Sequence, residues 1–338
     1  MLTFPIGQDR QDYFRPSTNL FFDFVDSIVD QYDLHNTIQP GHVTNIISAN
    51  IHIPSSGPLP DPGLVLTLGD GRIVGAKAVV LAVGINSQPR LPDCIPSTGD
   101  HITHTGEIPY KGLIPASLQS KVANPTLCTR ALVIGGGLTS VQIVDALIKA
   151  GVNHVILLCR SPYIRVKDFD FGLDWAAKYK NVQKAAFWNE TDMEERYRMI
   201  GEAREGGSVN PEYWRILRNH LKSGKVDLVS GACIKEHVWD EQENKWNVNF
   251  QGAPDVDLTP KQLKELECRW EQVDHIYCAT GSKPDIECIE CMQSILRSHP
   301  IEILHGLPCL TEDLQWHEDV PLFLVGGFAA LQIGPVSF

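Results

Sequence analysis

The chain has 338 residues, enough for two domains that each bury a core of their own. Its 43% hydrophobic and 21% charged residues are typical of a globular protein, and its net charge of −12 excludes a general nucleic-acid surface. No apolar stretch has the length of a membrane span, and the nine scattered cysteines favour reduced thiols. We therefore expect a cytoplasmic protein with no membrane or nucleic-acid partner, and the composition allows a homo-oligomer.

The first regular element that the sequence predicts is an amphipathic helix. Leu20–Val29 has apolar residues at helical spacing, and Ser17 or Thr18 precedes it as an N-cap. The helix carries several phenylalanines close together, which are most simply part of a core. These residues are Phe21, Phe22 and Phe24.

Short strands are predicted after this helix. His42–Ile47 alternates in polarity, and Leu64–Leu68 followed by the turn residues Gly69–Gly71 predicts a hairpin. Lys77–Gly84 is an apolar run that ends in glycine and predicts a buried strand of the parallel type. The proline-rich stretch 88–96 then predicts a linker.

The most informative stretch is a strand, a glycine turn and a helix in direct succession. Ala131–Ile134 is an apolar run, three glycines follow, and Val141–Ile148 has helical spacing. Gly135 permits a sharp turn, and Gly137 lets the backbone approach a phosphate closely. Ser140 takes the third small position of the fingerprint. The helix N-terminus would offer its free N–H groups to a pyrophosphate, so this stretch predicts a dinucleotide site.

The next strand favours NADPH over NADH. His154–Cys159 is apolar and ends at Arg160 and Ser161. Arg160 lies 25 residues after Gly135, near the place where an NAD-binding site carries an acidic residue. A cation and a hydroxyl at this place would suit a ribose 2′-phosphate. Arg165 and Lys167 would add positive charge.

Helices and then strands follow. Residues 169–224 are predicted to be mostly helical, with one helix that starts at Pro211 and ends at Gly224. The apolar runs beyond it predict a return to strands, and the strand at Val273 ends in Ala-Thr-Gly, like the earlier run that ends in glycine. The predicted strands are Val226–Val229, Trp246–Phe250, Val273–Cys278 and Leu322–Val325.

Taken together, these marks resemble the two-dinucleotide-binding-domain flavoproteins, in particular the flavin-dependent monooxygenases that include the ornithine and lysine N-hydroxylases. The resemblance implies an α/β fold with two Rossmann-like domains, in which the NADPH domain is inserted into an incomplete FAD domain. The implied domains are 1–112 (FAD), 113–283 (NADPH) and 284–338 (return to FAD). The segments that carry the resemblance are Val79–Gly84, the glycine fingerprint with Arg160, Asp274–Gly281 and Val325–Pro335.

The same resemblance implies where the cofactors NADPH and FAD bind. NADPH would be held by Gly135, Gly136, Gly137, Leu138, Thr139, Ser140, Arg160 and Ser161. The approach between the cofactors would be lined by Ala279, Thr280 and Gly281, and FAD would be contacted by Gly326, Gly327 and Gln332. The flavin carries the chemistry in such proteins, so no side chain is assigned a catalytic role and no metal is expected.

Three departures from the family pattern limit what the resemblance implies. Ser282 stands where the N-hydroxylases have tyrosine, and Cys278 replaces a larger apolar residue, so their substrate class does not carry over. No glycine fingerprint for FAD occurs between Met1 and Ile73. We therefore expect the sequence to be a fragment of a longer flavoprotein.

Several polar residues have a functional and a simpler interpretation. His101 and His104 lie in a faint echo of a hydroxylase motif, and we interpret them as loop or surface residues. Asp168, Asp170 and Asp174 follow the strand that precedes Arg160, where a loop could reach the nicotinamide or the substrate. Local capping and a solvated face are the simpler interpretation of these carboxylates.

Three functions are compatible with the sequence. The first is an NADPH-dependent FAD oxidoreductase, a flavin monooxygenase that oxygenates a small molecule. The second is a catalytically inactive, regulatory NADPH-binding protein, which the missing FAD fingerprint favours. The third is a thiol–disulfide reductase that uses Cys288 and Cys291, although this pair is more simply a set of helix-packing cysteines.

Overall fold

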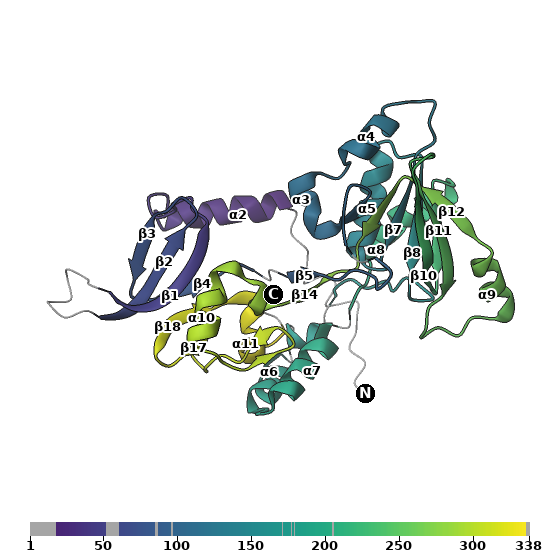
Figure 1. The fold of residues 1–338 in the computed structure, drawn as a ribbon. Coiled ribbons are helices and arrows are strands. Elements are labelled where there is room, and N and C mark those ends of the chain that lie inside the picture. Colours follow the sequence, from purple (N-terminus) through teal and green to yellow (C-terminus); the bar gives the residue numbers. More distant parts are fainter. Residues whose placement is uncertain are drawn as a thin grey trace. The chain divides into compact units, whose positions relative to one another are not determined.

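The computed structural model describes residues 18–51, 61–84, 87–95, 97–170, 172–176, 178, 180–204 and 206–335. The chain forms two compact units, each built from separate stretches of sequence (Figure 1). Unit 1 consists of Met1–Ser87, Gly172–Ala203 and Pro284–Phe338. Unit 2 consists of Gln88–Phe171 and Arg204–Lys283. Within the described ranges, no helix combines the length and the apolar character needed to cross a membrane.

A five-stranded parallel sheet is the centre of unit 2. Its strand order is β6-β13-β7-β8-β9, and every neighbouring pair is parallel. The order of β9, β8, β7 and β13 is that of a doubly wound dinucleotide-binding domain, 3-2-1-4. The strands are β6 (Ile102–His104), β7 (Arg130–Ile134), β8 (His154–Cys159), β9 (Val226–Ser230) and β13 (His275–Cys278).

Both faces of this sheet are covered, which explains why its strands are almost continuously apolar. Ala131 and Val133 point to a core shared with α5 (Leu138–Lys149) and α8 (Pro211–Lys222). Leu132 belongs to the opposite core, under the antiparallel sheet β10-β11-β12 (Figure 1). The strands of this second sheet are β10 (Ala232–Asp240), β11 (Lys245–Gly252) and β12 (Trp270–Val273).

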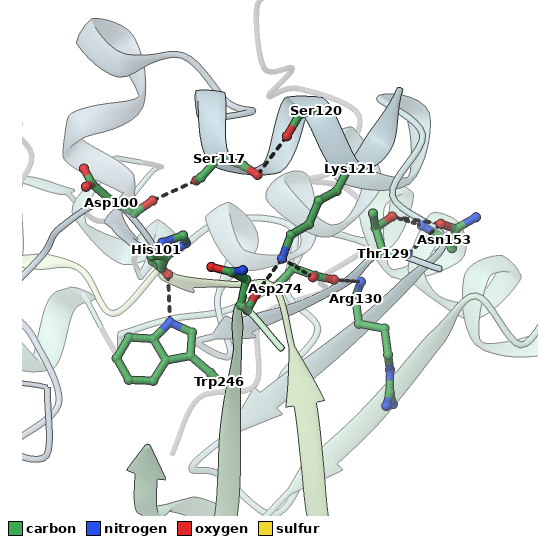
Figure 2. A network of polar contacts seen from close by, with 11 residues as sticks. Asp100, His101, Ser117, Ser120, Lys121, Thr129, Arg130, Asn153, Trp246 and Asp274 are labelled. Atoms are coloured by element: carbon green, nitrogen blue, oxygen red, sulfur yellow. Dashed lines mark hydrogen bonds and ion pairs between the residues drawn. The ribbon is translucent and has the colours of Figure 1, made fainter. Parts of the chain in front are cut away.

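A buried polar network fixes one end of the parallel sheet (Figure 2). Asp274, which directly precedes β13, accepts a hydrogen bond from the Lys121 ammonium at 2.7 Å and one from the Arg130 backbone N–H at 2.8 Å. The same ammonium donates to the carbonyl of Asn244, and Lys121 itself belongs to α4 (Ala116–Val122). One carboxylate therefore joins α4, β7 and β13 at the edge where these strands begin.

Two three-stranded sheets lie in the described part of unit 1. The first is antiparallel, in the order β1-β2-β3, and the hairpin predicted around Gly69–Gly71 joins β2 to β3. The second has the order β17-β18-β4, with β18 and β4 parallel as predicted. Val80 in β4 is exposed, so the expectation of a strand buried on both faces is wrong. The strands are β1 (Val43–Ile51), β2 (Asp61–Leu68), β3 (Ile73–Ala76), β4 (Val79–Leu81), β17 (Gln315–His317) and β18 (Val320–Leu324).

Helices complete unit 1, and one of them departs from the prediction. In α2 (Thr18–Gln31), Phe21, Phe22 and Phe24 are each more than half exposed, so their placement in a core is wrong. Helical spacing shows that side chains share a face, but it does not identify what covers that face. The N-cap predicted at Ser17 lies outside the described residues. The other helices of this unit include α6 (Lys180–Asn189), α7 (Met193–Arg204), α10 (Gln293–Ser298) and α11 (Ala330–Ile333).

The compact units divide the chain at points other than the implied domain bounds. Unit 2 begins at Gln88 because β6 pairs with β13 and joins the parallel sheet. Residues 172–203 belong to unit 1, where Phe187 and Ile200 enter the core around Trp316 and Phe328. The chain passes between the units in β5 (Ser87–Pro89) and β14 (Ser282–Pro284), which pair with each other.

Candidate dinucleotide site

The glycine turn between β7 and α5 is packed so tightly that Gly135 and Gly136 leave no room for a side chain. Gly135 has φ +150°, and a Cβ on it would overlap the carbonyl oxygen of Ala279. A Cβ on Gly136 would lie 2.5 Å from the sulfur of Cys159, and one on Gly137 would lie 3.4 Å from the Cα of Gly207. Three segments that are distant in sequence therefore converge on this turn, as a close approach of backbone to ligand requires.

The N-terminus of α5 is open for an anion. No side chain caps this helix, and its N-cap Gly137 is extended. The hydroxyl of Ser140 donates to the carbonyl of Gly137 at 2.6 Å, so Ser140 offers its backbone N–H and not its side chain. The first N–H groups of a helix, here from Leu138, Thr139 and Ser140, have no acceptor inside the helix. Together with the positive end of the helix dipole, these groups are what an anion at this position would need.

Positive charge lies at the same edge of the sheet. The N–H of Gly135 donates to the carbonyl of Leu158 at 2.9 Å, so Arg160 and Ser161 leave β8 beside the turn. Arg160 is exposed, and no ion pair reaches it in the part of the chain that the structure describes. Burial raises the pKa of the Cys159 thiol, and the neighbouring Arg165 guanidinium opposes part of that rise. The carbonyl of Arg165 accepts the N–H of Val209 at 2.8 Å, two residues beyond Gly207, which joins the segment after β8 to a segment beside the turn.

The segment Ala279–Gly281 borders the turn on its other side. The N–H of Ala279 donates to Ile134 at 2.8 Å, continuing the pairing of β13 with β7. The carbonyl of Gly281 accepts two hydrogen bonds, from His104 Nε2 at 2.9 Å and from the Arg90 N–H at 3.0 Å. The hydroxyl of Thr280 donates to the carbonyl of Arg90. The backbone after β13 is thus fixed where it leaves the sheet.

The interpretation as loop or surface residues is wrong for His104, which lies in β6, and holds in part for His101, which lies in the turn before that strand. His104 is 3% exposed, and its Nδ1 accepts the N–H of Gly106 while its Nε2 holds Gly281. His101 is half-buried, with its ring stacked on Trp239 at 3.9 Å. The physical reason is that β6 joins the parallel sheet, a long-range pairing that local sequence does not reveal.

The residues predicted to contact FAD lie in unit 1. Gly326 follows β18 with φ +69°, and Gly327 is buried beside it. The amide of Gln332 accepts a hydrogen bond from Arg196 at 2.9 Å and donates one to Leu310 at 2.6 Å, so both of its ends are bound to protein. In this unit β18, the Gly326–Gly327 turn and the short helix α11 follow one another along the chain. The residues present in unit 2 fit NADPH, whereas those described in unit 1 supply only the Gly326–Gly327 turn for FAD.

The sequence did not predict that residues 206–208 lie beside the glycine turn at Gly137. Gly206 and Gly207 both have positive φ, and Gly207 packs on Gly137. The hydroxyl and the N–H of Ser208 both donate to the carboxylate of Asp170. Asp170 therefore bonds a distant segment and is not a local cap. The paired glycines before the helix at Pro211 were the available signal.

Comparison of the sequence with known proteins gives a partial match. No family model matches the chain. Over 138 residues it is 28% identical to a probable FAD-binding monooxygenase, AlmA, of Acinetobacter sp., which covers 40% of this chain and 26% of that protein. The chain thus spans about a quarter of the length of this curated relative.

Solved structures match over almost the whole chain. An ornithine N-hydroxylase of Kutzneria sp. 744, KtzI, has a TM-score of 0.67 at 16% identity, covering 98% of this chain and 75% of the other. The chain has the fold of the flavin-dependent N-hydroxylases. The L-lysine 6-monooxygenase of Pseudomonas syringae has a TM-score of 0.65 at 15% identity and covers 98% of this chain and 74% of its own. The predicted two-domain α/β flavoprotein fold is confirmed.

Proposed function

We propose that this chain acts in an NADPH-dependent FAD oxidoreductase, a flavin monooxygenase that oxygenates a small molecule in the cytoplasm. The observation that carries the proposal is the convergence of Ala279, Cys159 and Gly207 on the three glycines at the uncapped start of α5. This is a cradle for a pyrophosphate, with Arg160 at the same edge. The fold shared with the N-hydroxylases supports the reaction class.

The residues of unit 2 would bind and orient the nucleotide. Bound NADPH would supply a hydride for the reduction. The N–H groups of Leu138, Thr139 and Ser140 would hold the pyrophosphate, and the guanidinium of Arg160 would pair with the 2′-phosphate. His104 would act as a positioning residue, because its bond to Gly281 fixes the segment that would face the nicotinamide. An ordered site of this kind reduces the entropic cost of bringing two reactants together.

For FAD, the proposal relies on Gly326 and Gly327 in unit 1, where the positive φ of Gly326 gives the backbone the sharp turn that a close approach to a ligand needs. The described residues contain no partner for the adenosine part of FAD.

Two other functions are less well supported. A purely regulatory NADPH-binding protein would not need the second unit, whose core is closely packed around Trp316 and Phe328. A thiol–disulfide reductase would need a stabilised thiolate at its cysteine pair. Instead, the exposed Cys288 lies 3.1 Å from the carboxylate of Asp285, and burial raises the pKa of Cys291.

The test is a visible absorption spectrum of the purified chain, recorded alone, with FAD and then with NADPH. We expect a stoichiometric flavin band that is bleached by NADPH but far less by the same concentration of NADH. A protein that takes up no FAD and binds no NADP⁺ would contradict the proposal. One that binds NADP⁺ but no FAD would favour the inactive NADPH-binding alternative.

A further inference from the structure

A short strap passes beside the glycine turn of the proposed NADPH site in unit 2. It consists of Gly206–Val209, and it joins the end of α7 to the residue that caps α8. Gly206 and Gly207 have φ +58° and +43°, which lets the strap bend beside the glycine turn. A Cβ built on Gly137 would touch the Cα of Gly207 at an ordinary contact distance of 3.4 Å, so the strap passes about one methyl group away from the glycine turn.

The far side of the strap is bound to the basic segment that follows β8. The N–H of Val209 donates to the carbonyl of Arg165 at 2.8 Å, and the N–H of Lys167 donates to the carbonyl of Val209 at 3.0 Å. These bonds form a parallel bridge between Val166 and Val209. The strap thus lies between the glycine turn and the segment that carries Arg165 and Lys167.

One carboxylate fastens the strap. Asp170 Oδ1 accepts two hydrogen bonds from Ser208, one from its N–H at 3.1 Å and one from its hydroxyl at 2.9 Å. Gly206 and Gly207 are exposed, whereas Ser208 is 6% exposed and Val209 is fully buried, so the second half of the strap is anchored in the packed unit. Asp170 follows the basic segment in sequence and bonds to Ser208, so the strap is attached to this part of the chain by its side-chain bonds as well as by the backbone bonds of Val209.

We propose that the strap is a specificity element of the NADPH site and that Asp170 is the positioning residue that holds it. By fixing Ser208 and Val209, Asp170 keeps Arg165 and Lys167 beside the glycine turn, where a 2′-phosphate would lie next to Arg160. The inference rests on the proposed function, because it assigns a role within the same nucleotide site. The ligand class is a dinucleotide or nucleoside that carries a 2′-phosphate.

The experiment compares Asp170→Ala with Asp170→Asn. Both variants remove the negative charge, but the amide oxygen of asparagine still accepts both bonds from Ser208, so their difference isolates the hydrogen bonds. Titration calorimetry on the full chain measures the Kd for NADP⁺, NAD⁺ and 2′-phospho-AMP. We expect Asp170→Ala to bind NADP⁺ and 2′-phospho-AMP about tenfold more weakly than Asp170→Asn, and NAD⁺ equally well.

Two controls keep the result specific. Asp240→Ala removes a carboxylate that accepts two backbone N–H groups in the hairpin between β10 and β11, and it should leave all three Kd values unchanged. Ser208→Ala removes one of the two bonds and should give an intermediate loss, which serves as the test if Asp170→Ala does not fold.

The outcomes separate the inference from the proposed function. Equal NADP⁺ affinity in the two Asp170 variants, or equal losses for NADP⁺ and NAD⁺, would overturn the role of the strap while leaving the site itself in place. A wild-type chain that binds no 2′-phosphorylated nucleotide would overturn the proposed function, and the strap inference with it.

Discussion

Gly135 and Ala279 are packed so closely that the carbonyl oxygen of Ala279 occupies the space a side chain on Gly135 would need. Gly135 also has φ +150°, which L-residues rarely adopt. This contact joins the glycine fingerprint to the Ala-Thr-Gly segment after β13. Two sequence marks about 140 residues apart therefore form one structural feature.

Gly135→Ala should disrupt the nucleotide site and lower the stability of unit 2. The added methyl group must push β7 and β13 apart or move the turn, and overpacking of this kind costs about 1–3 kcal/mol. We expect NADP⁺ binding to weaken by at least about tenfold in a calorimetric titration. Gly99→Ala in the same unit is the control, because nothing lies within 4 Å of its Cβ position. Equal binding by the two variants would contradict the packing argument.

Arg160→Ala should weaken the binding of NADPH far more than the binding of NADH. A charge-assisted hydrogen bond to a phosphate contributes about 1.5–3 kcal/mol, so we expect about a 10- to 100-fold rise in Kd for NADPH. The Kd for NADH should change by less than about twofold, since NADH has no 2′-phosphate. Arg218→Ala removes an exposed arginine from α8 and is the matched control. The same loss for both nucleotides would show that Arg160 does not bind the 2′-phosphate.

The sequence predicted the elements whose signal is local. The apolar run of β7, its glycines and the spacing in α5 are contiguous, and so is the hairpin around Gly69–Gly71. The buried state of His104 and the bond between Asp170 and Ser208 depend on pairing between distant segments. The phenylalanines of α2 are a case in which a local pattern led to a wrong prediction. The amphipathic spacing indicates a helix, but it does not indicate whether other residues cover the apolar face.

Asp274→Ala should strongly destabilise unit 2 without altering the nucleotide site directly. The Asp274 side chain is 2% exposed, and its loss leaves the Lys121 ammonium and the Arg130 N–H without their carboxylate. Breaking a buried ion pair on one side costs about 3–5 kcal/mol. Urea denaturation measures this free energy of unfolding. The double variant Lys121→Met with Asp274→Leu should lose less than the sum of the two single changes, and additive losses would contradict a direct pairing.

His275 should make the stability of unit 2 fall in mild acid. It is fully buried, with its Nε2 2.9 Å from the hydroxyl of Thr103 and its Nδ1 without a partner among the described residues. Burial, aided by the neighbouring His101, lowers the pKa of His275 from 6.5 to about 3. Between these two values the unfolded chain binds a proton that the folded imidazole does not. The stability is therefore complete above pH 6.5 and decreases as the pH falls towards 3.

His275→Gln should remove this dependence, because glutamine stays neutral and can still bond to Thr103. As the pH falls from 6.5 to 4.5, the free energy of unfolding of the wild type should decrease by up to about 1.4 kcal/mol per pH unit more than that of the variant. Below pH 4.5, carboxylates with a lowered pKa, such as Glu107 and Asp145, begin to contribute to the slope. Urea denaturation at several pH values gives the two slopes. Parallel slopes would mean that the buried imidazole is protonated in the folded state or that His275 becomes accessible before unit 2 unfolds.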